Sequence, residues 1–159
     1  MLQTAPTIKT IPTMLRLDFE DLTAFERVSE QYRHLGVHFN DAIAFEPSNP
    51  AFLPKSGSFV LMPLGHKITL NVSFDHPTCW VGAYVCGAGS IILTALDRSG
   101  NIIAQVSTNS AVYARPSNLK AATRGQQLEL NRRGIAKVIF HSTQPFILDD
   151  FFFSCAAIA

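Results

Sequence analysis

Two pairs of adjacent carboxylates are the residues of this sequence whose chemistry is easiest to state. Glu20-Asp21 and Asp149-Asp150 sit next to the first and the last expected strands. Carboxylate oxygens at a strand end, supplemented by loop carbonyls, are the ligands that Ca²⁺ takes. The same groups also accept backbone N–H donors in turns. A carboxyl pair hydrolyses a glycosidic bond only when it flanks a substrate cleft, and nothing here indicates one. A metal-binding or capping role is therefore the simpler interpretation.

Aromatic side chains are the second group with an assignable chemistry. We select Trp80, Tyr84 and Tyr113 as a candidate sugar-binding platform, with Arg115 as a polar partner. Trp80 and Tyr84 share one face of an expected strand, and an aromatic face combines apolar contact with tolerance for a sugar's hydroxyl rim. The same two side chains equally fit a second core layer or a place beneath the long loop of residues 45–58. The sequence leaves both alternatives open.

No catalytic constellation is recognisable. The five histidines show no His-x-His spacing, and no Cys-x-x-Cys or mixed Cys/His spacing indicates zinc or iron–sulfur. The serines lack the Gly-x-Ser-x-Gly elbow of a hydrolase. We expect no catalytic residues and no enzyme, and a dispersed glycosidase site is the one enzymatic alternative that stays open.

Composition limits the function classes further. The chain has 159 residues, of which 47% are hydrophobic and 16% charged, with a formal net charge of +1. This size suits one domain with a substantial core, and the near-neutral charge gives no field to attract nucleic acid or an anionic membrane. No apolar run approaches the roughly 20 residues of a membrane helix. No signal peptide is visible, which predicts either a cytoplasmic protein or a trimmed extracellular chain.

The elements that position these residues are read as strands. Residues 91–96 and 102–106 are β-rich arms joined by Asp97-Arg98-Ser99-Gly100, which predicts a hairpin closed by a type I turn with Gly100 in the left-handed conformation. Further strands are expected from alternation and turn signals. They cover residues 15–19, 37–39, 59–62, 68–74, 79–86, 135–141 and 146–154.

The remaining segments are expected to be less regular. Residues 1–14 form an extended or mobile lead-in before a single domain of residues 15–159. Near residues 29–35 we expect one short helix with Ser29 as its N-cap, ending before Gly36. Residues 45–58 read as a long ordered loop, a kind of segment that is often functional, and residues 113–128 as irregular with a helical turn within 119–127. About 8–10 strands separated by turns predict an antiparallel β-sandwich.

Four stretches, in matching order along the chain, carry a family resemblance. They are Leu17-Asp18-Phe19-Glu20-Asp21-Leu22, Val28-Ser29-Glu30-Gln31-Tyr32 leading to Gly36-Val37-His38-Phe39, Ala95-Leu96-Asp97-Arg98-Ser99-Gly100-Asn101, and Phe146-Ile147-Leu148-Asp149-Asp150-Phe151-Phe152-Phe153. Together they make the chain similar to jelly-roll β-sandwich domains of the galactose-binding or carbohydrate-binding-module type. Such domains often occur as uncharacterised single domains of bacterial surface proteins.

The resemblance implies that the first and last strands are neighbours and that a structural calcium is bound there. Glu20 and Asp149 would be its side-chain ligands, with Asp21 and Asp150 as substitutes. The function it favours is a non-catalytic module that binds a carbohydrate or glycoconjugate. The alternative is a protein-interaction or self-assembly domain. If the two faces of the Phe151-Phe152-Phe153 run are not both covered within the monomer, a homo-oligomer interface follows.

Overall fold

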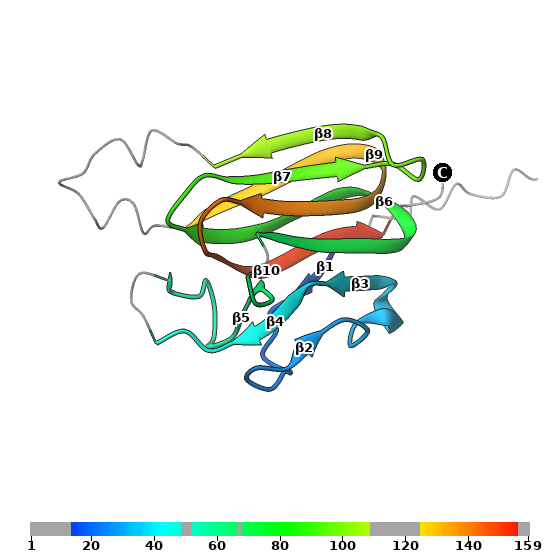
Figure 1. The fold of residues 1–159 in the computed structure, drawn as a ribbon. Coiled ribbons are helices and arrows are strands. Elements are labelled where there is room, and N and C mark those ends of the chain that lie inside the picture. Colours follow the sequence, from blue (N-terminus) through cyan, green and yellow to red (C-terminus); the bar gives the residue numbers. More distant parts are fainter. Residues whose placement is uncertain (1–13, 49–51, 67, 109–124, 156–159) are drawn as a thin grey trace, which may run out of the picture.

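The computed structural model describes residues 14–48, 52–66, 68–108 and 125–155, with the side chain of Cys155 excluded. In these residues it has ten strands and one short 3-10 helix, η1 (Figure 1). The elements are β1 (Met14–Leu17), β2 (Arg27–Val28), η1 (Arg33–Leu35), β3 (Val37–Asn40), β4 (Ala42–Phe45), β5 (Val60–Pro63), β6 (Thr69–Gly87), β7 (Ile91–Leu96), β8 (Ile102–Ser107), β9 (Gln126–Ser142) and β10 (Phe146–Cys155). None of the described helical residues forms a segment long and apolar enough to cross a membrane.

Two long strands build the two layers of the sandwich. Every pairing is antiparallel, and β6 and β9 pair with each other along most of their length. Near one end β6 also pairs with β3 and β9 pairs with β7, which pairs with β8. Near the other end β6 pairs with β10. On its other edge β10 pairs with both β1 and β5; β5 then pairs with β4, and β4 with β2. Because β6 and β9 belong to both groups, they bend between the layers (Figure 1).

Phenylalanine rings fill the space between the layers. The ring of Phe151, on β10, lies 5.6 Å from that of Phe39 on β3 and 6.3 Å from that of Phe74 on β6. It also contacts Phe140 on β9 with ring centroids 6.4 Å apart. These contacts join strands of opposite layers, and Phe151 is completely buried. The prediction of an all-β antiparallel sandwich is confirmed.

The predicted hairpin is confirmed as β7 and β8. In its turn, the Asp97 Oδ1 atom accepts hydrogen bonds from the N–H groups of Ser99 and Asn101, both 2.9 Å long. Gly100 has a φ of 83°, in the left-handed region that glycine enters without steric penalty. The aspartate and the glycine therefore both stabilise the turn that the sequence predicts.

The short helix is present but begins later than expected. Its N-cap is Tyr32, and Gly36 closes it with a φ of 77°. Ser29 does not start the helix, because its N–H group donates to the Gln31 side chain and its carbonyl accepts from Phe39 on β3. The N-cap assignment was wrong because Ser29 is held by a strand instead.

The greatest departure from the expected elements concerns β6. The sequence indicates separate strands at 68–74 and 79–86, whereas one strand runs from Thr69 to Gly87. Shifts of register between Ser73 and Thr78 accommodate the intervening Pro77 within a continuing strand. A helical turn was expected within residues 119–127 of an irregular segment 113–128. Residues 119–124 lie outside the described residues, and from Gln126 onward the chain is strand β9 instead. Residues 1–13 of the expected lead-in also lie outside them, and Met14 already belongs to β1.

Candidate functional site

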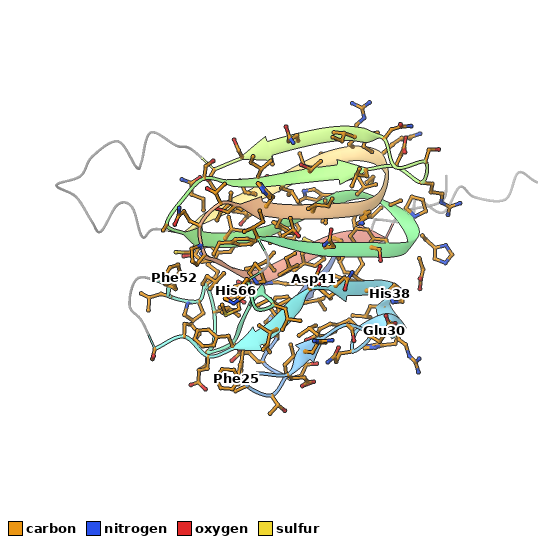
Figure 2. All side chains as sticks on the ribbon, viewed as in Figure 1. Phe25, Glu30, His38, Asp41, Phe52 and His66 are labelled. Atoms are coloured by element: carbon orange, nitrogen blue, oxygen red, sulfur yellow. The ribbon has the colours of Figure 1, made fainter. Side chains whose placement is uncertain are left out.

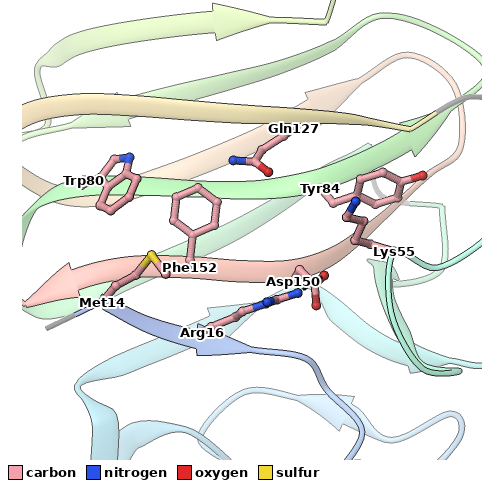
Figure 3. Close-up of a pocket in the computed structure, with 8 residues that line it drawn as sticks. All are labelled: Met14, Arg16, Lys55, Trp80, Tyr84, Gln127, Asp150 and Phe152. Atoms are coloured by element: carbon pink, nitrogen blue, oxygen red, sulfur yellow. Dashed lines mark hydrogen bonds and ion pairs between the residues drawn. The ribbon is translucent and has the colours of Figure 1, made fainter.

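A groove of about 310 Å³ lies on the outer face of the layer that contains β10 (Figure 3). Four elements and a loop supply its lining. The lining residues are Met14 and Arg16 of β1, Lys55 of the loop before β5, Trp80 and Tyr84 of β6, Gln127 of β9, and Asp150 and Phe152 of β10.

Strand alternation explains why these side chains face outward. On β6, Val81, Ala83 and Val85 are buried in the core, so Trp80 and Tyr84 project to the opposite face. Gln127 on β9 is paired in register with Tyr84 and therefore lies beside it on the same face. The β6 alternation that suggested an aromatic platform is thus real.

Gly82 allows a third aromatic ring to complete the floor of the groove. It lies between Trp80 and Tyr84 on β6, and a Cβ atom there would overlap the ring of Phe152. The bare backbone lets that ring lie across β6, where it meets Trp80 edge-to-face at 5.3 Å and 65°. Figure 3 shows Phe152 between Trp80 and Tyr84. The floor is therefore an aromatic strip rather than two isolated rings.

The loop before β5 is fastened to the groove by the Asp149-Asp150 pair. Asp149 Oδ2 accepts the N–H groups of Lys55 and Ser56, at 2.7 and 3.0 Å. Asp150 Oδ1 accepts the Ser56 hydroxyl at 2.7 Å, and its Oδ2 accepts Arg16 at 2.6 Å. Asp150 takes up a left-handed φ of 46°. Two neighbouring carboxylates thus hold β1, β10 and the loop together.

The charges of the site are set by this packing. Asp149 is fully buried, and loss of hydration raises its pKa to about 6, although three backbone N–H donors oppose the rise. The hydrogen bond and charge of Asp150 raise the pKa of Arg16, so its guanidinium stays charged. Burial raises the pKa of Tyr84, whose ring lies 5.9 Å from the Lys55 ammonium. Arg16 and Asp150 therefore present opposite charges side by side in the groove.

The groove unites two of the four predicted ligand-binding residues. Trp80 and Tyr84 both line it. Tyr113 and Arg115 lie outside the described residues. Sequence reasoning did not identify Arg16, Lys55, Gln127 or Phe152 as ligand contacts. Arg16 carried one available signal, because it is a polar residue on the outward face of the first alternating strand.

The four predicted calcium ligands are distributed over three separate sets of donors. The first and last strands are neighbours as expected, since β1 pairs with β10. Glu20 accepts the N–H groups of Ser58 and Phe59, each at 2.8 Å. Asp21 accepts the Tyr32 hydroxyl at 2.7 Å, and Asp149 and Asp150 bind the loop and Arg16.

This arrangement does not fit a calcium ion. The oxygens of Glu20 and Asp149 receive N–H donors where a cation would require open lone pairs, and Asp150 faces a guanidinium. No group of three or more His, Cys, Asp or Glu side chains in the described residues is placed to hold a metal. The capping role weighed from the sequence describes what these carboxylates do here, and structural calcium stays a prediction.

Comparison of the sequence with models of known families and with curated proteins finds no match. Solved structures share the fold. An adhesin domain of Lys-gingipain from Porphyromonas gingivalis has a TM-score of 0.53 at 14% identity, over 91% of this chain and 99% of that domain. The chain folds as a β-sandwich of that type. A family 29 carbohydrate-binding module has a TM-score of 0.44 at 6% identity, over 89% of this chain and 92% of the module. Another, from Piromyces equi, has 0.41 at 8%, over 77% and 93%.

The similarity to the adhesin domain bears out the resemblance to jelly-roll β-sandwich domains at the level of the fold. It concerns the fold alone. The function therefore has to be argued from the groove.

Proposed function

We propose that this protein is a non-catalytic carbohydrate-binding module whose ligand lies in the groove on the outer face of β6 and β10. The observation that carries the proposal is the aromatic strip of Trp80, Phe152 and Tyr84 on the floor of that groove. The C–H faces of a sugar ring pack on aromatic surface, while its hydroxyls point outward to polar groups. A volume of about 310 Å³ suits a small ligand or a few sugar rings.

The polar groups beside the strip include both hydrogen-bond donors and hydrogen-bond acceptors, which sugar hydroxyls require because each hydroxyl can donate and accept. Arg16 and Lys55 donate hydrogen bonds, Asp150 accepts them, and the Gln127 amide does both. Hydrogen bonds to charged groups are stronger than those between neutral partners. The Arg16–Asp150 pair, joined by a 2.6 Å hydrogen bond, places a charged donor group and a charged acceptor group side by side next to the strip. A neutral, polyhydroxylated ligand therefore finds acceptors for its hydroxyl hydrogens and donors for its hydroxyl oxygens in the groove.

Glycoside hydrolysis is less well supported by the same groove. A glycosidase needs two carboxyl groups that flank the scissile bond. Asp150 is the single carboxylate among the described lining residues, and it is paired with Arg16. Asp149 is fully buried and directed at loop N–H groups. Binding without hydrolysis is accordingly the activity that we propose.

The assembly alternative depended on an exposed face of the Phe151-Phe152-Phe153 run. Phe151 and Phe153 are buried in the core, and Phe152 is only 7% exposed on the groove side. Both faces of the run are covered within the chain, so the condition that pointed to an oligomer interface is not met. Whether the protein forms oligomers stays a prediction, which light scattering tests.

A glycan array probed with the parent protein and three variants tests the proposed function. Trp80→Ala and Tyr84→Ala each remove one end of the aromatic strip, and we expect each to lower affinity for the bound glycan about tenfold or more, as expected from removal of aromatic contact. Phe25→Ala is the matched control, because Phe25 is 71% exposed and is not part of the groove lining (Figure 2). No response on the array, or equal losses for all three variants, contradicts the proposal.

A further inference from the structure

One end of the aromatic strip is closed by the protein itself. Beyond Tyr84 along the outer face, Cys86 of β6 and Ile147 of β10 are the next side chains, and they are paired in register. They are only 2% and 3% exposed, because they form a second apolar cluster with Val60 of β5. Phe45 and Phe52 pack over this cluster. A ligand that lies on Tyr84 cannot continue along β6 past that point.

The closure is held by specific bonds. Asp149 and Asp150 accept the loop's Lys55 and Ser56 donors, as described above. Further along, Glu20 accepts the N–H groups of the two residues that lead into β5. The described part of the loop, residues 52–59, is thus bound to carboxylates of the sandwich at Lys55 and Ser56 and again at the two residues before β5. The end wall is a fixed part of the groove.

The opposite end of the strip is open among the described residues. Trp80 lies there, beside Met14 of β1, which is 47% exposed. Asn131 of β9 is paired with Trp80 and is also exposed. The Trp80 indole N–H donates to Glu129 Oε2 at 3.1 Å, and Glu129 is exposed as well. Within the described residues the groove is therefore closed beyond Tyr84 and bordered by exposed side chains at Trp80, which lie at its two ends in Figure 3.

The length of the strip exceeds one sugar ring. Trp80 and Tyr84 are four residues apart on one strand, which corresponds to roughly 13 Å at about 3.3 Å per residue. A single pyranose cannot contact both. At the blind end, the Lys55 ammonium lies 5.9 Å from the centre of the Tyr84 ring, and it forms no ion pair within the described residues. It is available to donate hydrogen bonds to the last sugar of a chain.

We infer, on the basis of the proposed carbohydrate-binding function, that the groove takes the terminus of an unbranched oligosaccharide and not an internal stretch. The terminal ring stacks on Tyr84 against the wall of residues 52–59, and Lys55 binds its hydroxyls. The chain then runs over Phe152 and leaves past Trp80.

Isothermal titration with end-modified oligosaccharides tests the inference. The probes are the β-1,4-linked tetraoses of glucose, galactose, mannose and xylose, each as the free sugar, reduced to the alditol at the reducing end, and methylated on the terminal hydroxyl at the other end. One of the two modifications is expected to lower affinity by about tenfold or more, since it removes hydrogen bonds at the wall, and the other to have little effect. Equal affinity for all three forms of a bound tetraose overturns end binding and leaves the proposed function standing. Failure of every tetraose to bind overturns both.

A lysine variant gives an independent readout. Lys55→Ala keeps the backbone N–H that anchors the loop to Asp149, so the wall is preserved. The variant is expected to lose about tenfold in affinity for the free tetraose and little for the form modified at the bound end, which no longer engages the ammonium. Lys137→Ala, at an exposed position of β9 outside the groove lining, is the matched control. Equal losses for both forms of the sugar contradict the role assigned to Lys55.

Discussion

Replacement of Gly82 by alanine tests how the floor of the groove is built. A Cβ atom at this position would overlap the Phe152 ring and lie 2.5 Å from the Leu128 carbonyl oxygen and 2.9 Å from Glu129 Cβ. The ring can turn away, but the carbonyl belongs to the paired strand β9 and cannot move without a change in the β6–β9 pairing. Gly82→Ala therefore disturbs both the floor and the sheet.

The magnitude follows from overpacking in a tight site. Inserting a methyl group into well-packed structure costs about 1–3 kcal/mol. Loss of backbone freedom in the unfolded chain offsets up to about 1 kcal/mol of this. We expect the free energy of unfolding to fall by about 1–2 kcal/mol, which lowers the melting temperature by roughly 2–8 °C. Glycan affinity falls as well, because the Phe152 ring is displaced.

Urea unfolding of a double-mutant cycle with Phe152→Ala is the assay. In the Phe152→Ala background the overlap with the ring is absent, so Gly82→Ala is expected to cost less there than in the parent. The contact with the Leu128 carbonyl persists and leaves a residual effect. Gly82→Ala with parental stability would refute the close packing. Equal costs in the two backgrounds would refute the assignment of the effect to Phe152.

Three further predictions concern titration and local structure. The pKa of Asp149 is raised from 3.8 to about 6, so between these values the folded state binds a proton that the unfolded chain has lost. The free energy of unfolding should therefore fall by about 3 kcal/mol as the pH rises from about 4 to 6. Urea unfolding of Asp149→Asn should lack this decline. Hydrogen bonds that the His38 ring donates to Asp75 and Glu30 raise the pKa of His38 (Figure 2 shows His38 beside Glu30). The stabilisation from this pair is therefore complete below pH 6.5 and is lost as the pH rises through the raised pKa, a decline that thermal melts of His38→Gln should not show. Asp97→Ala removes two turn hydrogen bonds, and we expect a loss of about 1 kcal/mol in urea unfolding.

Local patterns account for the parts of the fold that the sequence predicted well. The β7–β8 hairpin depends on an aspartate and a glycine three positions apart, and both act within the turn itself. The outward direction of Trp80 and Tyr84 follows from alternation with Val81, Ala83 and Val85, which has a period of two whatever the neighbouring strand. Such features need no knowledge of which strands pair.

Features set by distant pairing were beyond the sequence. Lys55 reaches the groove because its N–H group binds Asp149, which is 94 residues away. Arg16 faces Asp150 across 134 residues, through the pairing of the first and last strands. Gln127 joins Tyr84 only through the register of β6 and β9. The sequence likewise suggested Ser29 as a helix cap, whereas in the fold its carbonyl accepts a hydrogen bond from the N–H group of Phe39.

The carboxylate pairs show a different limit. Glu20 and Asp149 were chosen as metal ligands because hard oxygens gather near the terminal strands. In the fold they gather on one loop, but each binds N–H donors of that loop. A residue type alone does not reveal whether its partner is a cation or a backbone amide, since a carboxylate accepts either.

The most direct test of the central claim uses the protein's own fluorescence. Trp80 is the single tryptophan in the chain and lines the groove, so its emission reports on that site alone. If sugar rings stack on the aromatic strip, titration with a glycan that the protein binds on the array will change the emission saturably, with the same dissociation constant that calorimetry gives. Binding of that glycan with unchanged Trp80 emission would place the site elsewhere and contradict the account.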